Sequence, residues 1–346
     1  NFKYIDAAVA KASAHGAKIL LTLGQTPGWA SSRPNEASAN GPGYSAEPTR
    51  LDDWQKYVEA VVERYKGRIS YYEIWNEPYY DDIAGRTTKG HFSGSVASMI
   101  NMAKAASGVI RRVDPAAKIV SPSCTSPRTI GFVCVELFLA NGGAKYVDIL
   151  GFHYYANPEE YPEISLKLQG LQNKYGVSLP IWNTEYGFLT DLQYARPRPE
   201  LGPPFDKVAS RSATAAKAAR AMLFNITYGV QKAFYYSWDI PDMGIADRRG
   251  ADQDVDGVRA YAQAKSWFLD SVFLGRPVAY GTSIYFQKAR SRAGRERLFV
   301  WNYSEMPADF ARDELDGMKS VQTLQGAVEK IGSNVTIDPG TMYMFY

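Results

Sequence analysis

The chain has 346 residues, of which 45% are hydrophobic and 22% charged, and its formal net charge is +3. This composition is ordinary for a globular protein with room for one large domain and a small one. The small net charge gives no electrostatic reason to expect nucleic acid or an anionic membrane as a partner. No apolar run approaches the roughly 20 residues of a membrane-spanning helix.

Aromatic and cysteine residues add two observations. The chain holds 24 Tyr and seven Trp, most of which we expect in the core, although flat rings also stack on sugars. Cys124 and Cys134 lie ten residues apart, and the chain has only three His. This spacing matches no metal site, so we expect neither a metal nor another cofactor. A disulfide and two free thiols both remain compatible with the pair.

Helical and strand-length apolar patterns alternate from the first residue onward. The predicted helices cover residues 1–16, 51–66, 95–113, 131–141, 161–175, 206–229 and 258–271. The predicted strands cover residues 17–24, 70–76, 118–122, 147–155, 179–187 and 232–239. The loop between the first strand and the second helix is long and rich in Gly, Pro, Ser and Asn, as functional loops often are.

This alternation predicts a parallel sheet with crossover helices. Long polar loops follow the strands and short loops follow the helices, which is typical of a (β/α)8 TIM barrel. A doubly wound sheet is the rival, but no G-x-G-x-x-G motif follows any strand. A barrel needs eight strands and six are found, so we expect the first two strands to precede Asn1, outside this sequence. No signal peptide is visible at Asn1 either.

The pattern changes near residue 273. Short strand-like segments separated by turn residues fill the rest of the chain, which predicts a small β-sandwich. We therefore divide the chain into a barrel domain, residues 1–272, and a β-rich accessory domain, residues 273–346. A structural role is the simpler expectation for the accessory domain, and a separate sugar-binding module is the alternative.

Two glutamates end predicted strands. Glu77 lies in "YYEIWNEPYY" and Glu185 in "IWNTEYG", and parallel strands point their carboxyl ends at one face of a barrel. Two opposed carboxyl groups are the minimal apparatus for cutting a glycosidic bond. Either glutamate alone could instead cap a helix or form a salt bridge. Glu73 shares a strand face with Glu77, so we expect it to lie one layer lower and to play a supporting part.

These segments resemble a known group of enzymes. "IWNEP" and "NTEYG" are similar to the two signatures of clan A retaining glycoside hydrolases. Together with "LLTLGQTPGWAS", "GFHYY" and the β-rich end, they resemble glycoside hydrolase family 39, which includes β-xylosidases, α-L-iduronidases and bacterial exopolysaccharide endoglycosidases. The resemblance implies that Glu77 is the acid/base and Glu185 the nucleophile. Burial and nearby negative charge should then raise the pKa of Glu77.

Further residues are candidates for binding substrate. The resemblance implies that Asn76 contacts a sugar 2-hydroxyl and that His153 and Tyr155 match a pair that commonly orients the nucleophile. Trp238 could form a sugar platform. The remaining candidates are Trp29, Gln25, Tyr79 and Tyr236. The chain departs from the family at the third barrel strand, where Gln25 or Thr26 stands near the place of a common His.

The sequence thus predicts a monomeric retaining glycoside hydrolase that acts on an oligo- or polysaccharide. Similarity to compact exopolysaccharide hydrolases favours endo-action on a bacterial exopolysaccharide. A polymeric substrate implies a periplasmic or secreted protein. The alternatives are an exo-acting β-xylosidase-like glycosidase, a non-catalytic glycan-binding barrel, and a structural or adhesive barrel without a sugar ligand.

Overall fold

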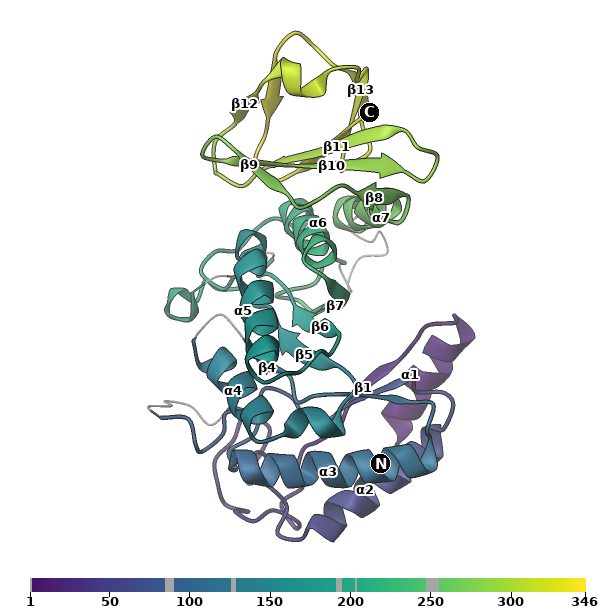
Figure 1. The fold of residues 1–346 in the computed structure, drawn as a ribbon, viewed down its shortest axis with the longest axis vertical. Coiled ribbons are helices and arrows are strands. Elements are labelled where there is room, and N and C mark those ends of the chain that lie inside the picture. Colours follow the sequence, from purple (N-terminus) through teal and green to yellow (C-terminus); the bar gives the residue numbers. More distant parts are fainter. Residues whose placement is uncertain (1, 85–89, 126–128, 191–194, 203, 247–254) are drawn as a thin grey trace. The chain divides into compact units, whose positions relative to one another are not determined.

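A computed structural model describes residues 2–84, 90–125, 129–190, 195–202, 204–246 and 255–346 (Figure 1). The chain forms two compact units. The first unit comprises residues 1–154 and 166–184, and the second comprises residues 155–165 and 185–346. Among the described residues, no helix combines the length and the apolar character that a membrane span needs.

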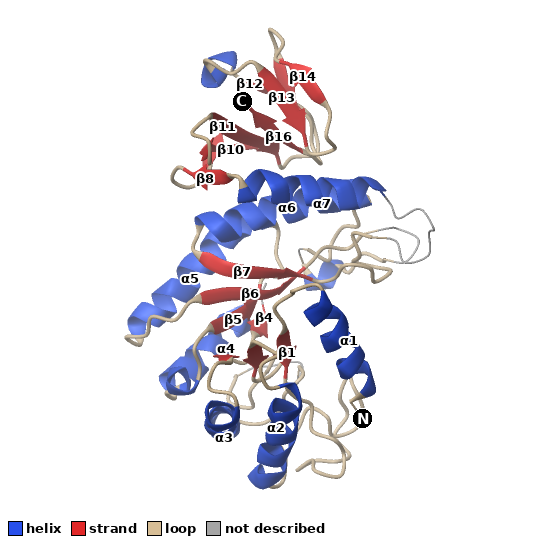
Figure 2. Cartoon of the chain, turned by 90° about the vertical axis from the view of Figure 1, so that its right-hand side faces the viewer, coloured by secondary structure: helices blue, strands red, loops and turns tan. Residues whose placement is uncertain are grey.

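The first unit alternates helices and strands in the predicted order. Its elements are α1 (Lys3–Ala14), β1 (Leu20–Thr22), α2 (Leu51–Tyr65), β2 (Tyr71–Glu73), α3 (Val96–Val113), β3 (Lys118–Val120), β4 (Cys124–Thr125), α4 (Thr129–Ala140), η1 (Gly143–Tyr146) and β5 (Leu150–His153). α5 (Tyr161–Lys174) and β6 (Ile181–Tyr186) each cross the boundary between the units. Helices α1 to α4 lie around the outside of the strands (Figure 2).

The strands of this unit follow one another in chain order. β1, β2 and β3 form a parallel sheet in which Leu20 pairs with Tyr71, and Tyr71 pairs with Lys118. A second sheet has the order β4-β5-β6-β7, in which β7 (Val230–Tyr235) belongs to the second unit, and β4 pairs with β5 in parallel. Because successive strands are neighbours, their carboxyl ends meet at one edge of the sheet, where sequence-distant side chains can converge.

Helix burial follows the sequence pattern. In α2 the buried residues Trp54, Val58, Val61 and Tyr65 recur at helical spacing, and α2 packs beside α3. The Trp54 indole N–H donates to the Met102 carbonyl at 2.9 Å, which ties the two helices together. The observed bounds of α2 and α3 differ from the predicted ranges by at most one residue at each end.

The strand pattern did not reveal β4. The prediction placed one strand over residues 118–122, whereas β3 ends at Val120 and β4 begins at Cys124. Pro122 lies between them and has no N–H to donate to a neighbouring strand, so the pairing is interrupted there. A disulfide joins Cys124 to Cys134 of α4, with their Cα atoms 6.1 Å apart. Of the two states left open by the sequence, the structure therefore has the bridged one.

The second unit carries the α-helices α6 and α7 and the antiparallel part of the chain. Its elements begin with η2 (Pro158–Glu160), η3 (Pro199–Leu201), α6 (Arg211–Thr227), β7 (Val230–Tyr235) and α7 (Val255–Leu269). The antiparallel strands are β8 (Ser271–Phe273), β9 (Val278–Tyr280), β10 (Ile284–Ser291), β11 (Glu296–Asn302), β12 (Ala308–Phe310), β13 (Ser320–Thr323), β14 (Val328–Lys330), β15 (Val335–Ile337) and β16 (Met342–Phe345), with η4 (Arg312–Leu315) between β12 and β13.

These strands build a β-rich region, as the sequence predicts. Seven of them form one sheet in the order β14-β13-β16-β11-β10-β8, with β9 also paired to β10. β12 and β15 form a separate pair, and their Phe310 and Ile337 share a buried core with Phe286 and Val300 of the large sheet. α6 begins at Arg211 rather than at residue 206, because the Ser210 hydroxyl caps it by accepting from the Ala213 N–H.

Candidate active site

Glu77 has an unusual backbone. It follows β2 and the buried residue Trp75, and it is the only described residue other than glycine with a positive φ, at 40°. Its N–H donates to the Ser123 carbonyl at 2.9 Å, and its carbonyl accepts from the His91 N–H at 3.1 Å. Such a conformation costs on the order of 1–3 kcal/mol, and strained residues of this kind cluster at functional sites.

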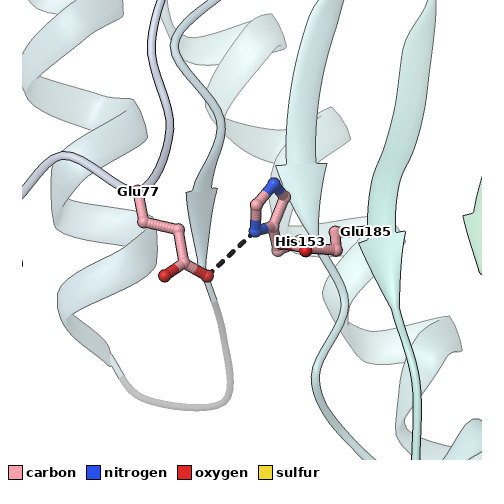
Figure 3. A group of neighbouring side chains, drawn as sticks. All are labelled: Glu77, His153 and Glu185. Carbon is pink, nitrogen blue, oxygen red and sulfur yellow. Dashed lines mark hydrogen bonds and ion pairs between the residues drawn. The ribbon is translucent and has the colours of Figure 1, made fainter. Parts of the chain in front are cut away.

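Two histidines face the Glu77 carboxylate, one at each oxygen. Nδ1 of His153, the last residue of β5, lies 2.9 Å from Oε1 in a hydrogen bond (Figure 3). Nε2 of His91 lies 3.6 Å from Oε2, which is longer than a hydrogen bond. The His153 side chain is only 2% exposed, whereas that of Glu77 is 20% exposed. The carboxylate thus stays open on one side while its orientation is fixed.

The two histidines reverse the predicted pKa shift. Burial by itself raises the pKa of Glu77, but the hydrogen bond from His153 and the charges of His153 and His91 outweigh it, so the pKa lies below its ordinary value. The expectation of a raised pKa was therefore wrong for this state of the protein. It took account of burial and of the neighbouring carboxylate, but not of the two imidazoles beside Glu77.

Glu185 is the fifth residue of β6, and it is half-buried while the four residues before it are buried. Those four residues belong to the first unit, and Glu185 follows them directly in the same strand. One side-chain atom each of Glu77, His153 and Glu185 lie within 4.8 Å of one another (Figure 3). Such donors also suit metal ions, but a metal on Nδ1 of His153 would have to displace its bond to Glu77. The group thus brings two carboxylates and one imidazole together.

Glu73 lies near this group, where it interacts electrostatically with His153. It is buried, and its carboxyl accepts hydrogen bonds from the Thr22 hydroxyl at 2.6 Å and from the Ser123 hydroxyl. The Thr184 hydroxyl, next to Glu185 in β6, donates to the Ser123 hydroxyl at 2.8 Å. Burial raises the pKa of Glu73 despite these donors and the charge of His153. The chain of hydroxyl groups links the carboxyl ends of β1, β2 and β6.

The other predicted site residues differ in how deeply they are buried and in what they contact. Asn76 is half-buried and pairs with Ser123 in a parallel bridge. Tyr79 is half-buried, and its N–H donates to the Phe92 carbonyl at 3.1 Å. Tyr155 is 8% exposed and packs on Phe205 within a small core. That burial leaves little of the Tyr155 ring for a ligand.

The remaining aromatic candidates are exposed. Trp29 is 81% exposed and lines a cavity of about 250 Å³ together with Gln25 and Tyr57. In the second unit, Trp238 is 47% exposed and Tyr236 43% exposed. These rings are therefore accessible, as sugar-stacking residues must be.

His91 was not predicted from the sequence. A signal was present, because the chain holds only three histidines and two of them, His91 and His153, lie at Glu77. His91 comes 14 residues after Glu77, and no periodic pattern connects the two. Histidine near a carboxylate is the usual means of tuning protonation in the physiological range.

The chain is similar to known proteins both in its sequence pattern and in its fold. The family model described as the glycosyl hydrolase catalytic core matches residues 52–244. No curated protein matches the chain in sequence. In structure, the chain is similar to a family 39 glycoside hydrolase from the gut symbiont Bacteroides cellulosilyticus WH2, with a TM-score of 0.67 and 15% identity over 99% of this chain and 70% of that one.

Two further structures are similar. A conserved exported protein from Bacteroides fragilis gives a TM-score of 0.62 and 10% identity over 97% of this chain and 78% of the other. The catalytic domain of the family 30 xylanase C from Talaromyces cellulolyticus gives 0.58 and 14% over 97% and 78%. At such low sequence identities, these structural similarities show only a shared fold.

Proposed function

Because the chain belongs to the glycosyl hydrolase catalytic core family, we propose that it is a retaining glycosidase with Glu185 as nucleophile and Glu77 as general acid and base. Membership of this family makes the chain a glycosidase and its substrate a carbohydrate. The retaining mechanism, the roles of individual residues and the identity of the sugar are the proposed part.

The observation that carries the proposal is the closeness of the two carboxyl groups. An oxygen of Glu77 and one of Glu185 lie within 4.8 Å of each other. Retaining glycosidases hold their carboxyl groups about 5–5.5 Å apart, whereas inverting enzymes need about 6.5–9.5 Å to admit a water between them. The short separation favours direct attack by one carboxylate on the sugar.

The mechanism assigns one role to each group in two steps. Glu185 attacks the anomeric carbon as the bond to the leaving oxygen breaks, and the Glu77 carboxyl gives its proton to that oxygen. In the second step a water loses a proton to Glu77 and attacks the same carbon, which releases Glu185. Because the histidines lower the pKa of Glu77, we expect the first step to be fastest under mildly acidic conditions.

We propose that residues 1–272, with their six predicted strands, form the catalytic domain as part of a (β/α)8 barrel, and that residues 273–346 form the accessory domain. Parallel strands in chain order support the barrel. So does the likeness of the whole chain to a family 39 glycoside hydrolase.

We assign substrate contacts to the residues near the strand ends. Asn76 would meet the 2-hydroxyl of the sugar, and the exposed ring of Trp238 would stack on the sugar at the cleavage site. Trp29 and Gln25 would hold a further sugar in their cavity of about 250 Å³. We propose endo-action on a bacterial exopolysaccharide by an exported enzyme. Similarity to an exported protein of Bacteroides fragilis supports the export.

A product assay tests the proposal. Wild type, Glu77→Gln, Glu185→Gln and the control Glu63→Gln, an exposed glutamate of α2, would be incubated with polysaccharides and aryl glycosides, with products read by mass spectrometry. Wild type and control should release products, and Glu185→Gln should not. Glu77→Gln should no longer cleave substrates with poor leaving groups. It should keep part of its rate on dinitrophenyl glycosides, whose leaving group needs no proton.

Other outcomes would contradict the proposal. Wild-type rates in either site variant would remove that residue from the mechanism. Binding of a glycan without any product would favour the glycan-binding alternative. Monosaccharides released from chain ends, instead of oligosaccharides, would favour exo-action.

A further inference from the structure

We propose that His91 is a positioning residue for the acid–base step: its Nε2 faces the second oxygen of the Glu77 carboxylate, and Asn40 holds its ring from behind. This inference rests on the proposed function and adds a residue to it. It also predicts that His91 sets the upper pH limit of the reaction.

The first support is the geometry of the His91 ring. Its Nε2 lies 3.6 Å from Oε2 of Glu77, and its Nδ1 lies 3.1 Å from Nδ2 of Asn40. In the neutral ring the Asn40 amide N–H donates to Nδ1, so the ring proton sits on Nε2, and a protonated ring carries a proton on Nε2 as well. That proton then faces the carboxylate. Catalytic contacts of this length often shorten when substrate binds.

The second support is the anchoring of the His91 backbone. Its N–H donates to the carbonyl of Glu77 at 3.1 Å, and its carbonyl accepts from the Trp75 indole N–H at 2.8 Å. Trp75 is 1% exposed, and it precedes Glu77 by two residues. The segment that carries the acid–base residue therefore also fixes His91, so the two side chains keep their separation.

The third support is the bracing of the loop that carries Asn40. Residues 25–50 form this loop, and the Ser45 carbonyl accepts from the Ser93 N–H at 2.7 Å. Arg33 donates to Glu47 at 2.8 Å and to the Ser93 hydroxyl at 3.0 Å. The loop is thus tied to the segment that follows His91, which keeps Asn40 in place.

The charged groups around Glu77 and His91 determine how His91 affects the ionisation of Glu77. The described titratable groups that face Glu77 are His91 and His153, with Glu185 close by. Asn40 is uncharged, and Arg33 in the same loop is bonded to Glu36 and Glu47. A donor on Oε2 stabilises the carboxylate that forms when Glu77 gives its proton to the leaving oxygen. It also makes Glu77 lose its proton at a lower pH.

The test is the pH dependence of kcat/KM with an aryl glycoside that has a poor leaving group. His91→Ala should move the basic limb to higher pH by about one unit, the shift typical of losing one close favourable partner. Asn40→Ala, which frees the ring, should move it in the same direction by less. His91→Gln keeps an N–H donor, so its limb should lie between those of wild type and His91→Ala. His15→Ala, at the end of α1, is the control and should leave the limb unchanged.

If His91 had a merely structural role, His91→Ala would lower kcat/KM without moving the basic limb of its pH profile. That result would overturn the inference. If His91→Ala fails to fold, His91→Gln and Asn40→Ala decide in the same way. Glu77→Gln, measured alongside, separates the two claims. Wild-type activity of Glu77→Gln on this poor-leaving-group substrate would refute the proposed function. Loss of that activity, with an unmoved limb in His91→Ala, would refute only the role of His91.

Discussion

The strained backbone at Glu77 predicts that glycine stabilises the protein at this position relative to alanine. Glu77 has a φ of 40°, and a residue with a Cβ atom pays about 1–2 kcal/mol for that left-handed conformation. Glycine pays no such cost, although it loses about 0.5–1 kcal/mol through its greater freedom in the unfolded chain. Glu77→Gly should therefore be about 0.5–1 kcal/mol more stable than Glu77→Ala.

The comparison needs a position at which the order is reversed. Glu59 lies in the middle of α2, and its ion pair with Arg112 is lost equally in either substitution. In a helix interior, glycine is about 0.8–1.0 kcal/mol worse than alanine. Glu59→Gly should therefore be less stable than Glu59→Ala by about that amount.

The assay is urea unfolding of the four variants, followed by fluorescence, with the midpoint differences compared within each pair. Opposite signs at the two positions would support a strained strand end that is maintained for function. If Glu77→Ala proved more stable than Glu77→Gly by about the helix value, the backbone at Glu77 would be ordinary. The link between strain and catalysis would then fail.

Three further predictions concern stability and substrate binding. Replacing Cys124 and Cys134 by Ser should lower the free energy of unfolding by about 2–3 kcal/mol, as expected for a loop of this length, and an unchanged urea midpoint would contradict it. Burial raises the pKa of Glu73 above its ordinary value of 4.5, so the folded protein keeps a proton that the unfolded chain loses, and stability falls as the pH rises through that interval. Glu73→Gln should remove this fall and be more stable than wild type at pH 7 but not at pH 4, and equal differences at both pH values would refute the buried charge. Trp29→Ala should raise KM for long oligosaccharides with little change in kcat, and an unchanged KM would remove its cavity from the substrate path.

Local pattern was enough to predict most of the secondary structure. The apolar face of α2 and the alternation of strands and helices depend on residues within one element, so their positions could be read from the sequence. The two glutamates could also be located, because Glu77 lies shortly after β2 and Glu185 lies near the end of β6. β4 could not, because its pairing depends on where Pro122 interrupts the sheet.

The electrostatics of the site could not be predicted in this way. The pKa of Glu77 depends on His153, which is 76 residues away in sequence, and on His91, which no periodic pattern connects to Glu77. Burial alone gave the wrong direction. The state of Cys124 and Cys134 likewise depends on the distance between β4 and α4, which no spacing of two cysteines determines.

The most direct test of the central claim is to trap the covalent intermediate. Wild-type protein would be incubated with dinitrophenyl 2-deoxy-2-fluoroglycosides of the sugars that the product assay identifies, then digested and analysed by mass spectrometry. The proposed mechanism predicts one fluoroglycosyl group on the peptide that contains Glu185, and none in Glu185→Gln. Hydrolysis of the parent substrate with no adduct, or an adduct on Glu77, would contradict it.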